Sequence, residues 1–133
     1  MSEILANVKQ IETVDTLNIV TFDFFGNDLK MMSLELSNEV QVGVKALLGI
    51  KPTSIIIAKD LTGRISFSNK LQGKIVSIDT GVLLSNVKIK IANSIFESII
   101  TKQTSKNMDL NVEDEVTIFI KASELSIVEV YND

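Results

Sequence analysis

Three short polar clusters in the second half of the sequence carry most of the groups that could bind a ligand. They are residues 65–73 (ISFSNKLQG), 100–105 (ITKQTS) and 120–123 (IKAS). Each cluster places hydroxyl or amide groups where an apolar run ends, and the third adds the ammonium group of Lys121. Hydroxyls, backbone N–H groups and one or two local cations can hold a small anion even in an acidic chain.

The composition argues against catalysis. The sequence contains no Cys and no His, which excludes thiolate and imidazole metal sites and the Cys/His and Ser–His–Asp nucleophilic systems. Asp109, Glu113, Asp114 and Glu115 form an acidic segment that is typical of a solvated loop, whereas acid–base catalysis needs carboxylates that face each other across a cleft. We therefore expect a binding protein and not an enzyme.

Charge and hydropathy restrict the partners and the location. The formal net charge is −4, and the 12 lysines and the lone Arg64 are scattered without a basic stripe. A nucleic-acid interface normally shows such a stripe together with stacking aromatics. The N-terminus lacks a signal peptide and no apolar run approaches the roughly 18 residues of a membrane span, so we expect a cytoplasmic protein without membrane insertion. The mean hydropathy of +0.28 is high for a small monomer and favours a homo-oligomer.

Alternation of apolar and polar residues predicts short strands over most of the chain. In the second half we expect one or two helical turns within residues 104–110. About five strands and one small helix in roughly 60 residues are typical of a small closed barrel of the OB type. The expected strands lie at 74–78, 87–91, 95–101, 115–121 and 125–130.

The first half repeats the order of the second. The apolar pattern of residues 8–24 recurs at 75–91, and that of 43–53 recurs at 113–123. The change in offset falls between the third and fourth strands, where loops tolerate insertion. We therefore predict an all-β chain of two tandem five-stranded OB-like barrels, each with a short helix, spanning 1–63 and 64–133.

The second half resembles the Mop module, a molybdenum-binding unit also found in transport-associated (TOBE) domains. Residues 66–73 (SFSNKLQG) are similar to the opening motif Ser-Ala-Arg-Asn-x-Leu-x-Gly, with Ser68 in place of the family's Arg. Residues 100–105 are similar to its Ile-Thr strand end with a following hydroxyl, and residues 121–123 to its closing Lys-Ala-Ser. The first half matches only weakly, and the whole chain resembles a di-Mop molybdate-binding protein.

This resemblance implies a tetrahedral oxyanion, molybdate or tungstate, as the ligand. Such a dianion offers only acceptor oxygens, so its site needs several converging donors, and the metal is bound only as the oxyanion, without side-chain metal ligands. Family members place the site between modules. The implied contacts in the second half are Ser66, Ser68, Asn69, Thr101, Thr104, Lys121, Ala122 and Ser123. Those in the divergent first half are Ser33, Lys51 and Thr53.

The resemblance further implies a homotrimer that serves molybdenum storage, homeostasis or sensing. A second reading is a Mop-like module without ligand that acts as an oligomerising partner of a molybdate transporter or regulator. We also expect the stronger donor sets in the second half, because Pro52 lacks the N–H group that Ala122 retains at the equivalent position.

Overall fold

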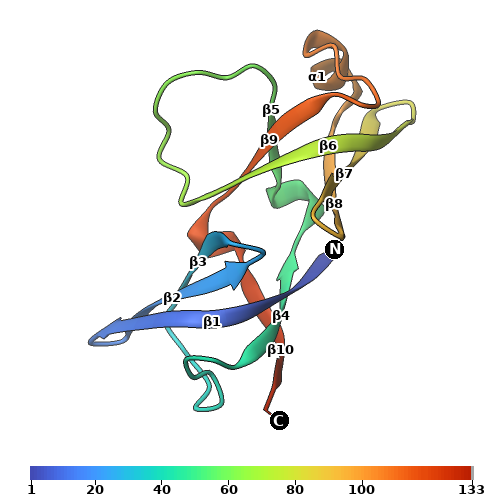
Figure 1. The fold of residues 1–133 in the computed structure, drawn as a ribbon. Coiled ribbons are helices and arrows are strands. Elements are labelled where there is room, and N and C mark those ends of the chain that lie inside the picture. Colours follow the sequence, from blue (N-terminus) through green and yellow to red (C-terminus); the bar gives the residue numbers. More distant parts are fainter. Residues whose placement is uncertain (133) are drawn as a thin grey trace.

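The computed structural model describes residues 1–132, which form two curled five-stranded sheets joined end to end (Figure 1). The predicted all-β fold of two OB-like barrels is therefore confirmed. The first barrel has the strand order β10-β4-β1-β2-β3, and the second has the order β5-β9-β6-β7-β8. The strands are β1 (Ser2–Val14), β2 (Leu17–Phe24), β3 (Asn27–Ser33), β4 (Lys45–Ile50), β5 (Ile56–Ala58), β6 (Asn69–Thr80), β7 (Leu84–Ile91), β8 (Ser94–Thr101), β9 (Glu115–Ile120) and β10 (Ser126–Tyr131).

The helices are short and differ between the two barrels. Helix α1 (Lys102–Asn107) begins two residues before the predicted start, because the Thr101 hydroxyl accepts a hydrogen bond from the Thr104 N–H and caps the helix. The first barrel has turns and no α-helix between β3 and β4. Both barrels have a 3₁₀ turn after the fourth strand, namely η1 (Pro52–Ser54) and η2 (Ala122–Glu124).

The sequence repeat appears in the backbone as matching irregularities. The β1–β2 register shifts between Val8 and Gln10, and the β6–β7 register shifts between Ile75 and Ser77, 67 residues later. A β-bulge bends a strand and increases its twist. The two bulges therefore curl the two sheets at equivalent points.

The turns before β4 and β9 also match. Gly43 and Glu113 both have positive φ angles, of 93° and 81°. The N–H of Gly43 donates to the carbonyl of Val8 at 2.8 Å, and the N–H of Glu113 donates to the carbonyl of Ile75 at 2.8 Å. The left-handed conformation favours glycine, so the first half supplies the natural residue and the second half accepts Glu113 at some cost.

Each barrel takes one edge strand from the other half of the chain. Strand β5 pairs with β9 in the second barrel, and β10 pairs with β4 in the first. Figure 1 shows the green β4–β5 segment and the red β9–β10 segment passing in opposite directions between the barrels. The division of the chain at residues 63 and 64 stays a prediction about sequence modules, since the sheets themselves interlock across it.

The two barrels share one hydrophobic core. Alternate residues of β1 and β6 point inward, and the buried apolar side chains of both sheets form one cluster. Phe24 of β2 and Phe96 of β8 meet edge to face at the junction, with ring centroids 5.9 Å apart. This continuous core, together with the exchanged edge strands, holds the two halves against each other.

The segment between β5 and β6, residues 59–68, forms a wide arch beside the second barrel (Figure 1). The ammonium group of Lys59 anchors its start, lying 2.9 Å from the Asp114 carboxylate and donating to the Asp109 carbonyl. The ring of Phe67 anchors its end against Phe119, with centroids 5.4 Å apart. Among the described residues, no helix has the length and apolar character needed to cross a bilayer.

Candidate functional site

The two 3₁₀ turns lie at the junction between the barrels and have the same geometry. Lys51 precedes η1 with φ −67° and ψ 140°, and Lys121 precedes η2 with φ −69° and ψ 146°. The Ser54 hydroxyl of η1 donates to the Glu124 carboxylate of η2 at 3.0 Å. Strand exchange thus brings the two closing motifs, one from each half, to the same region.

Turn η2 packs against β3 of the first barrel. A cleft of about 450 Å³ opens there, lined by Ser33 and Ser37 from the first half and by Ser123 and Ser126 from the second. Its floor is apolar, with Met31 among the lining residues. Ser33 and Ser123, predicted from different halves, therefore face one cleft.

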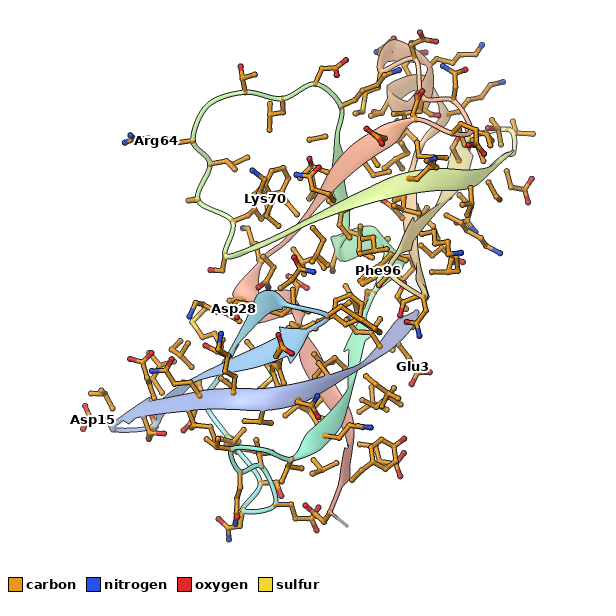
Figure 2. All side chains as sticks on the ribbon, viewed as in Figure 1. Glu3, Asp15, Asp28, Arg64, Lys70 and Phe96 are labelled. Atoms are coloured by element: carbon orange, nitrogen blue, oxygen red, sulfur yellow. The ribbon has the colours of Figure 1, made fainter. Side chains whose placement is uncertain are left out.

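The opening motif of the second half lies at the same end of β6. The β6–β9 register pairs Asn69 with Ile120, so Ser68 and Lys121, the next residues outward, lie beside each other at the end of the sheet. Both are exposed, as is Ser66 on the preceding arch. Arg64, the other cation in this part of the sequence, points outward from the arch and away from the barrels (Figure 2).

An equivalent junction exists on the other side. Turn η1 packs against β8, whose last residue is Thr101, and the buried Ser98 hydroxyl of β8 donates to the Ile55 carbonyl at 2.7 Å. Thr53 lies on η1, and Thr104 lies in the first turn of α1. Turn η1, which carries Thr53, therefore packs against the strand that ends at Thr101.

The hydroxyl groups at the two junctions differ in their availability. The Ser33 hydroxyl donates to the Glu35 carbonyl, so its proton is already used in a local turn. The Thr101 hydroxyl donates to the Thr104 oxygen at 2.8 Å, which leaves the Thr104 proton free to point elsewhere. Within residues 1–132, the side chain of Ser123 has no hydrogen-bond partner in the structure. The Ser123 hydroxyl can therefore donate to a ligand without breaking another bond.

Asn69 is the predicted contact residue whose surroundings differ most from the expectation. Its side chain is fully buried, with 0% exposure. Its Oδ1 atom accepts from the Lys30 N–H at 2.6 Å, and its Nδ2 group donates to the Lys30 carbonyl at 2.9 Å. Both polar ends of Asn69 are therefore engaged with the backbone of β3 in the other barrel.

The structure adds three polar residues that sequence reasoning did not include in the predicted site. Glu35 and Ser126 line the cleft between η2 and β3, and Glu124 places a carboxylate next to both 3₁₀ turns. The repeat aligns Ser54 with Glu124, which was the available signal that the two turns are chemically unequal. Ser126 gave no such signal, because the sequence does not say which sheet β10 joins.

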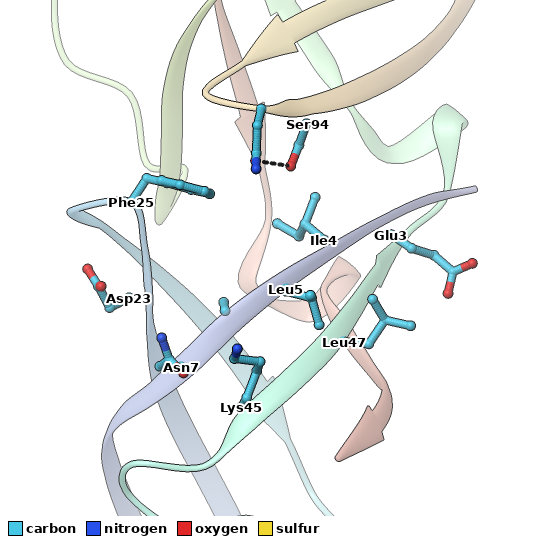
Figure 3. Close-up of a pocket in the computed structure, with 11 residues that line it drawn as sticks. Glu3, Ile4, Leu5, Asn7, Asp23, Phe25, Lys45, Leu47 and Ser94 are labelled. Carbon is cyan, nitrogen blue, oxygen red and sulfur yellow. Dashed lines mark hydrogen bonds between the residues drawn. The ribbon is translucent and has the colours of Figure 1, made fainter. Parts of the chain in front are cut away.

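A second cleft, of about 610 Å³, lies on the outer face of β1 and β4 (Figure 3). Glu3, Asp23, Lys45 and Ser94 line it together with the exposed ring of Phe25. It contains none of the predicted contact residues. Two carboxylates against one ammonium make it unsuitable for a dianion, and in residues 1–132 no three acidic side chains gather in a way that could hold a metal ion.

The fold and the junctions define a class, namely a two-barrel protein with polar groups gathered between its barrels. The TOBE domain family model matches residues 65–127, which is the part of the chain that carries the Mop/TOBE-like motifs, in agreement with the resemblance seen in the sequence. No curated protein matches the sequence.

Among solved structures, the chain is similar to the cytoplasmic molybdate-binding protein ModG, in a crystal form with molybdate bound. The TM-score is 0.88 at 21% identity, over 94% of this chain and 93% of the other. At this identity the likeness establishes the two-barrel fold. The neighbour is described as a binding protein, which agrees with the expectation of a binding protein rather than an enzyme.

Proposed function

We propose that this protein binds molybdate or tungstate as an intact oxyanion at sites formed between its two barrels. The observation that carries the proposal is the position of η2: its Lys-Ala-Ser motif belongs to the second half but packs against β3 of the first barrel. Donors from two halves can then approach a tetrahedral ligand from different directions. One barrel alone offers donors on one side only.

The first proposed site uses the ammonium group of Lys121, the N–H of Ala122 and the hydroxyl of Ser123. Ser66 and Ser68 approach from the start of β6, and Ser33 lies across the cleft. Each hydrogen bond to a charged group contributes on the order of 1.5–3 kcal/mol. Several such bonds are needed to offset the desolvation of a dianion.

The second proposed site is its counterpart at the other junction. It uses Lys51 and Thr53 from the first half and Thr101 and Thr104 from the second. Pro52 has no N–H to offer, so this site has one donor fewer. We place its affinity below that of the first site.

The comparisons support the ligand class. A TOBE domain covers residues 65–127, and the neighbour with the same two-barrel fold is described as a cytoplasmic molybdate-binding protein. We extend this description to the present chain as a cytoplasmic protein of molybdenum storage, homeostasis or sensing. We propose no nucleic-acid partner for this protein.

Calorimetric titration with molybdate, tungstate and sulfate tests the proposal. Molybdate and tungstate should bind alike, because they share charge and nearly the same radius. Sulfate is smaller, so the same donors cannot all reach it at good hydrogen-bond length, and it should bind at least about tenfold more weakly. Sulfate binding as tight as molybdate would contradict the size argument.

We further propose that the protein is a homotrimer. Several large apolar side chains are exposed in the single chain, among them Val82 and Leu83 at the β6–β7 turn and Val128 on β10. Apolar surface of this kind favours burial between copies. Light scattering should report a mass of about three chains at micromolar concentration, and a stable monomer would contradict the assembly.

Two observations favour an interaction module as a second candidate function. The Ser33 hydroxyl is already bonded within its own turn, and the apolar side chains at the β6–β7 turn are open to a partner. On this reading the barrels bind no oxyanion and join a transporter or regulator. Titration without heat for any of the three anions would favour it.

A further inference from the structure

We propose that Asn69 is a positioning residue that holds the two halves of the first site together, and not a contact to the ligand. The inference rests on the proposed function, because it assigns Asn69 a role at the oxyanion site between η2 and β3. It replaces the contact that the family resemblance implies for this residue.

The geometry leaves Asn69 no group for a ligand. Its Oδ1 atom accepts the Lys30 N–H at 2.6 Å and its Nδ2 group donates to the Lys30 carbonyl at 2.9 Å, with the side chain fully buried. A carboxamide that satisfies both backbone groups of one residue acts as an extra strand partner. It therefore fixes the edge strand β3, which on this side has no neighbour within its own sheet.

The position of Asn69 in the chain determines what it aligns. In the β6–β9 ladder Asn69 faces Ile120, the residue before Lys121. On β3, Lys30 precedes Ser33 by three residues, about 10 Å along an extended strand. The Asn69–Lys30 contact thus sets the distance between the closing motif on η2 and the strand end of the other barrel.

A weaker equivalent holds the second site. Ser2 begins β1 as Asn69 begins β6, and its hydroxyl accepts the N–H of Glu97 on β8 at 2.9 Å. Glu97 lies 67 residues after Lys30, so the two contacts are related by the repeat. The Ser2–Glu97 contact consists of one hydrogen bond, whereas the Asn69–Lys30 contact consists of two. The geometry of the first proposed site is therefore held more firmly than that of the second.

The test compares Asn69→Ser, Asn69→Ala and Ser2→Ala by molybdate titration of the full chain, with melting curves for each variant. Asn69→Ser copies the Ser2 arrangement and should weaken the tighter molybdate site about three- to tenfold. Asn69→Ala should weaken it more. Ser2→Ala should act on the weaker site and leave the tighter one unchanged.

A double-mutant cycle separates positioning from general stability. If Asn69 acts by placing the Lys121 motif, Asn69→Ser should have little further effect in the Lys121→Ala background and its full effect in the Lys51→Ala background. A purely structural role would give the same loss in both backgrounds and would overturn the inference. Asn69→Ser keeps the test available if Asn69→Ala does not fold.

The outcomes also separate the inference from the proposed function. Wild-type protein without measurable molybdate binding overturns both. Wild-type binding together with unchanged affinity in Asn69→Ser overturns only the positioning role. A loss in Asn69→Ser that disappears in the Lys121→Ala background supports both.

Discussion

The connections that follow β4 and β9 share one backbone path but carry different side chains. In both, a lysine in extended conformation leads into a 3₁₀ turn, and a 2.9 Å hydrogen bond joins the fourth residue's N–H to the lysine carbonyl, from Ser54 to Lys51 and from Glu124 to Lys121. Between them, Pro52 stands where the other copy has Ala122. A repeated backbone thus does not guarantee repeated chemistry, because the donors at the two turns differ.

The connections between the third and fourth strands differ more. After β8 the Thr101 hydroxyl caps α1, whereas after β3 the chain forms turns in which Ser33 and Ser37 bond to nearby backbone groups. The three extra residues of the second half lie in this region. The pocket beside β3 is consequently lined by serines in turns, while the equivalent position beside β8 borders a helix. The four predictions below test how far this inequality extends.

The largest effect is expected for Lys121→Ala against its matched variant Lys51→Ala. Each change removes one charged donor, which is worth about 1.5–3 kcal/mol. Lys121→Ala should therefore weaken molybdate binding at least about tenfold, and Lys51→Ala should cost less. Paired calorimetric titrations measure the difference, and melting curves should show both variants folded. Equal losses, or a larger loss for Lys51→Ala, would contradict the prediction that the junction at Lys121 binds molybdate more tightly.

Exchanging the residue after each lysine tests the contribution of a single backbone N–H group to the difference in affinity between the two sites. Ala122→Pro should weaken the tighter site by about tenfold, since it removes one hydrogen bond to a charged ligand. Pro52→Ala should strengthen the weaker site. Because Pro52 already occupies the matching backbone position, Ala122→Pro should leave the Tm nearly unchanged. A large drop in Tm would show that the two turns are not equivalent in backbone geometry.

The third prediction concerns a contact that only one barrel has. Lys59 anchors the arch after β5 through Asp114, and the repeat places Glu129 and Val44 at the corresponding positions, which cannot pair. The hydrogen bond from Lys59, followed by the backbone bond from Asn111, lowers the pKa of Asp114. The hydrogen bond to Asp114 raises the pKa of Lys59.

The sign of the pH dependence follows from these directions. A lowered carboxyl pKa stabilises the fold above the unfolded pKa of Asp114, and the contribution is lost as the pH falls through the folded value. Lys59→Met should therefore lower the Tm at pH 7, and the difference from wild type should shrink in acid. Lys9→Met serves as the control, because the Lys9–Asp28 pair is about half-exposed and should contribute less. A Tm difference that grows in acid would contradict the assignment.

The smallest effect is expected for Glu124→Gln. The Glu124 carboxylate accepts a hydrogen bond from Ser54 and lies beside both proposed sites, where it repels a dianion. An exposed charge interaction is worth about 0.5 kcal/mol, so Glu124→Gln should strengthen molybdate binding about twofold. The gain should fall at high salt, because screening weakens the repulsion. A gain that does not depend on salt would point to a change in structure instead.

Much of the fold could be predicted from local pattern. Alternating apolar residues give strands with one buried face, and this identified β7, β8, β9 and β10 within a few residues. The repeat between residues 8–24 and 75–91 correctly matched the two bulged strands. The start of α1 was placed too late, because the capping role of Thr101 competes with its reading as a strand residue.

The candidate site was predictable only in part. The motif at 121–123 is local in sequence, so its identity and its place at a strand end could be read directly. The partner surfaces on β3 and the cleft residue Ser126 could not, because they depend on pairing between segments far apart in the chain. Asn69 shows the limit best, since a motif residue that resembles a ligand contact proves to be a buried partner of Lys30.

The sequence by itself determined the strands, the duplication, the absence of Cys and His chemistry and the donor-rich motifs of the second half. Those features follow from residue types and short spacings. Only the tertiary structure decided that β5 and β10 change places and that each closing motif meets the opposite barrel. The physical reason is that edge strands of two similar sheets present nearly the same hydrogen-bonding groups and apolar faces. Which edge a strand joins is therefore settled by the packing of the whole core around the junction.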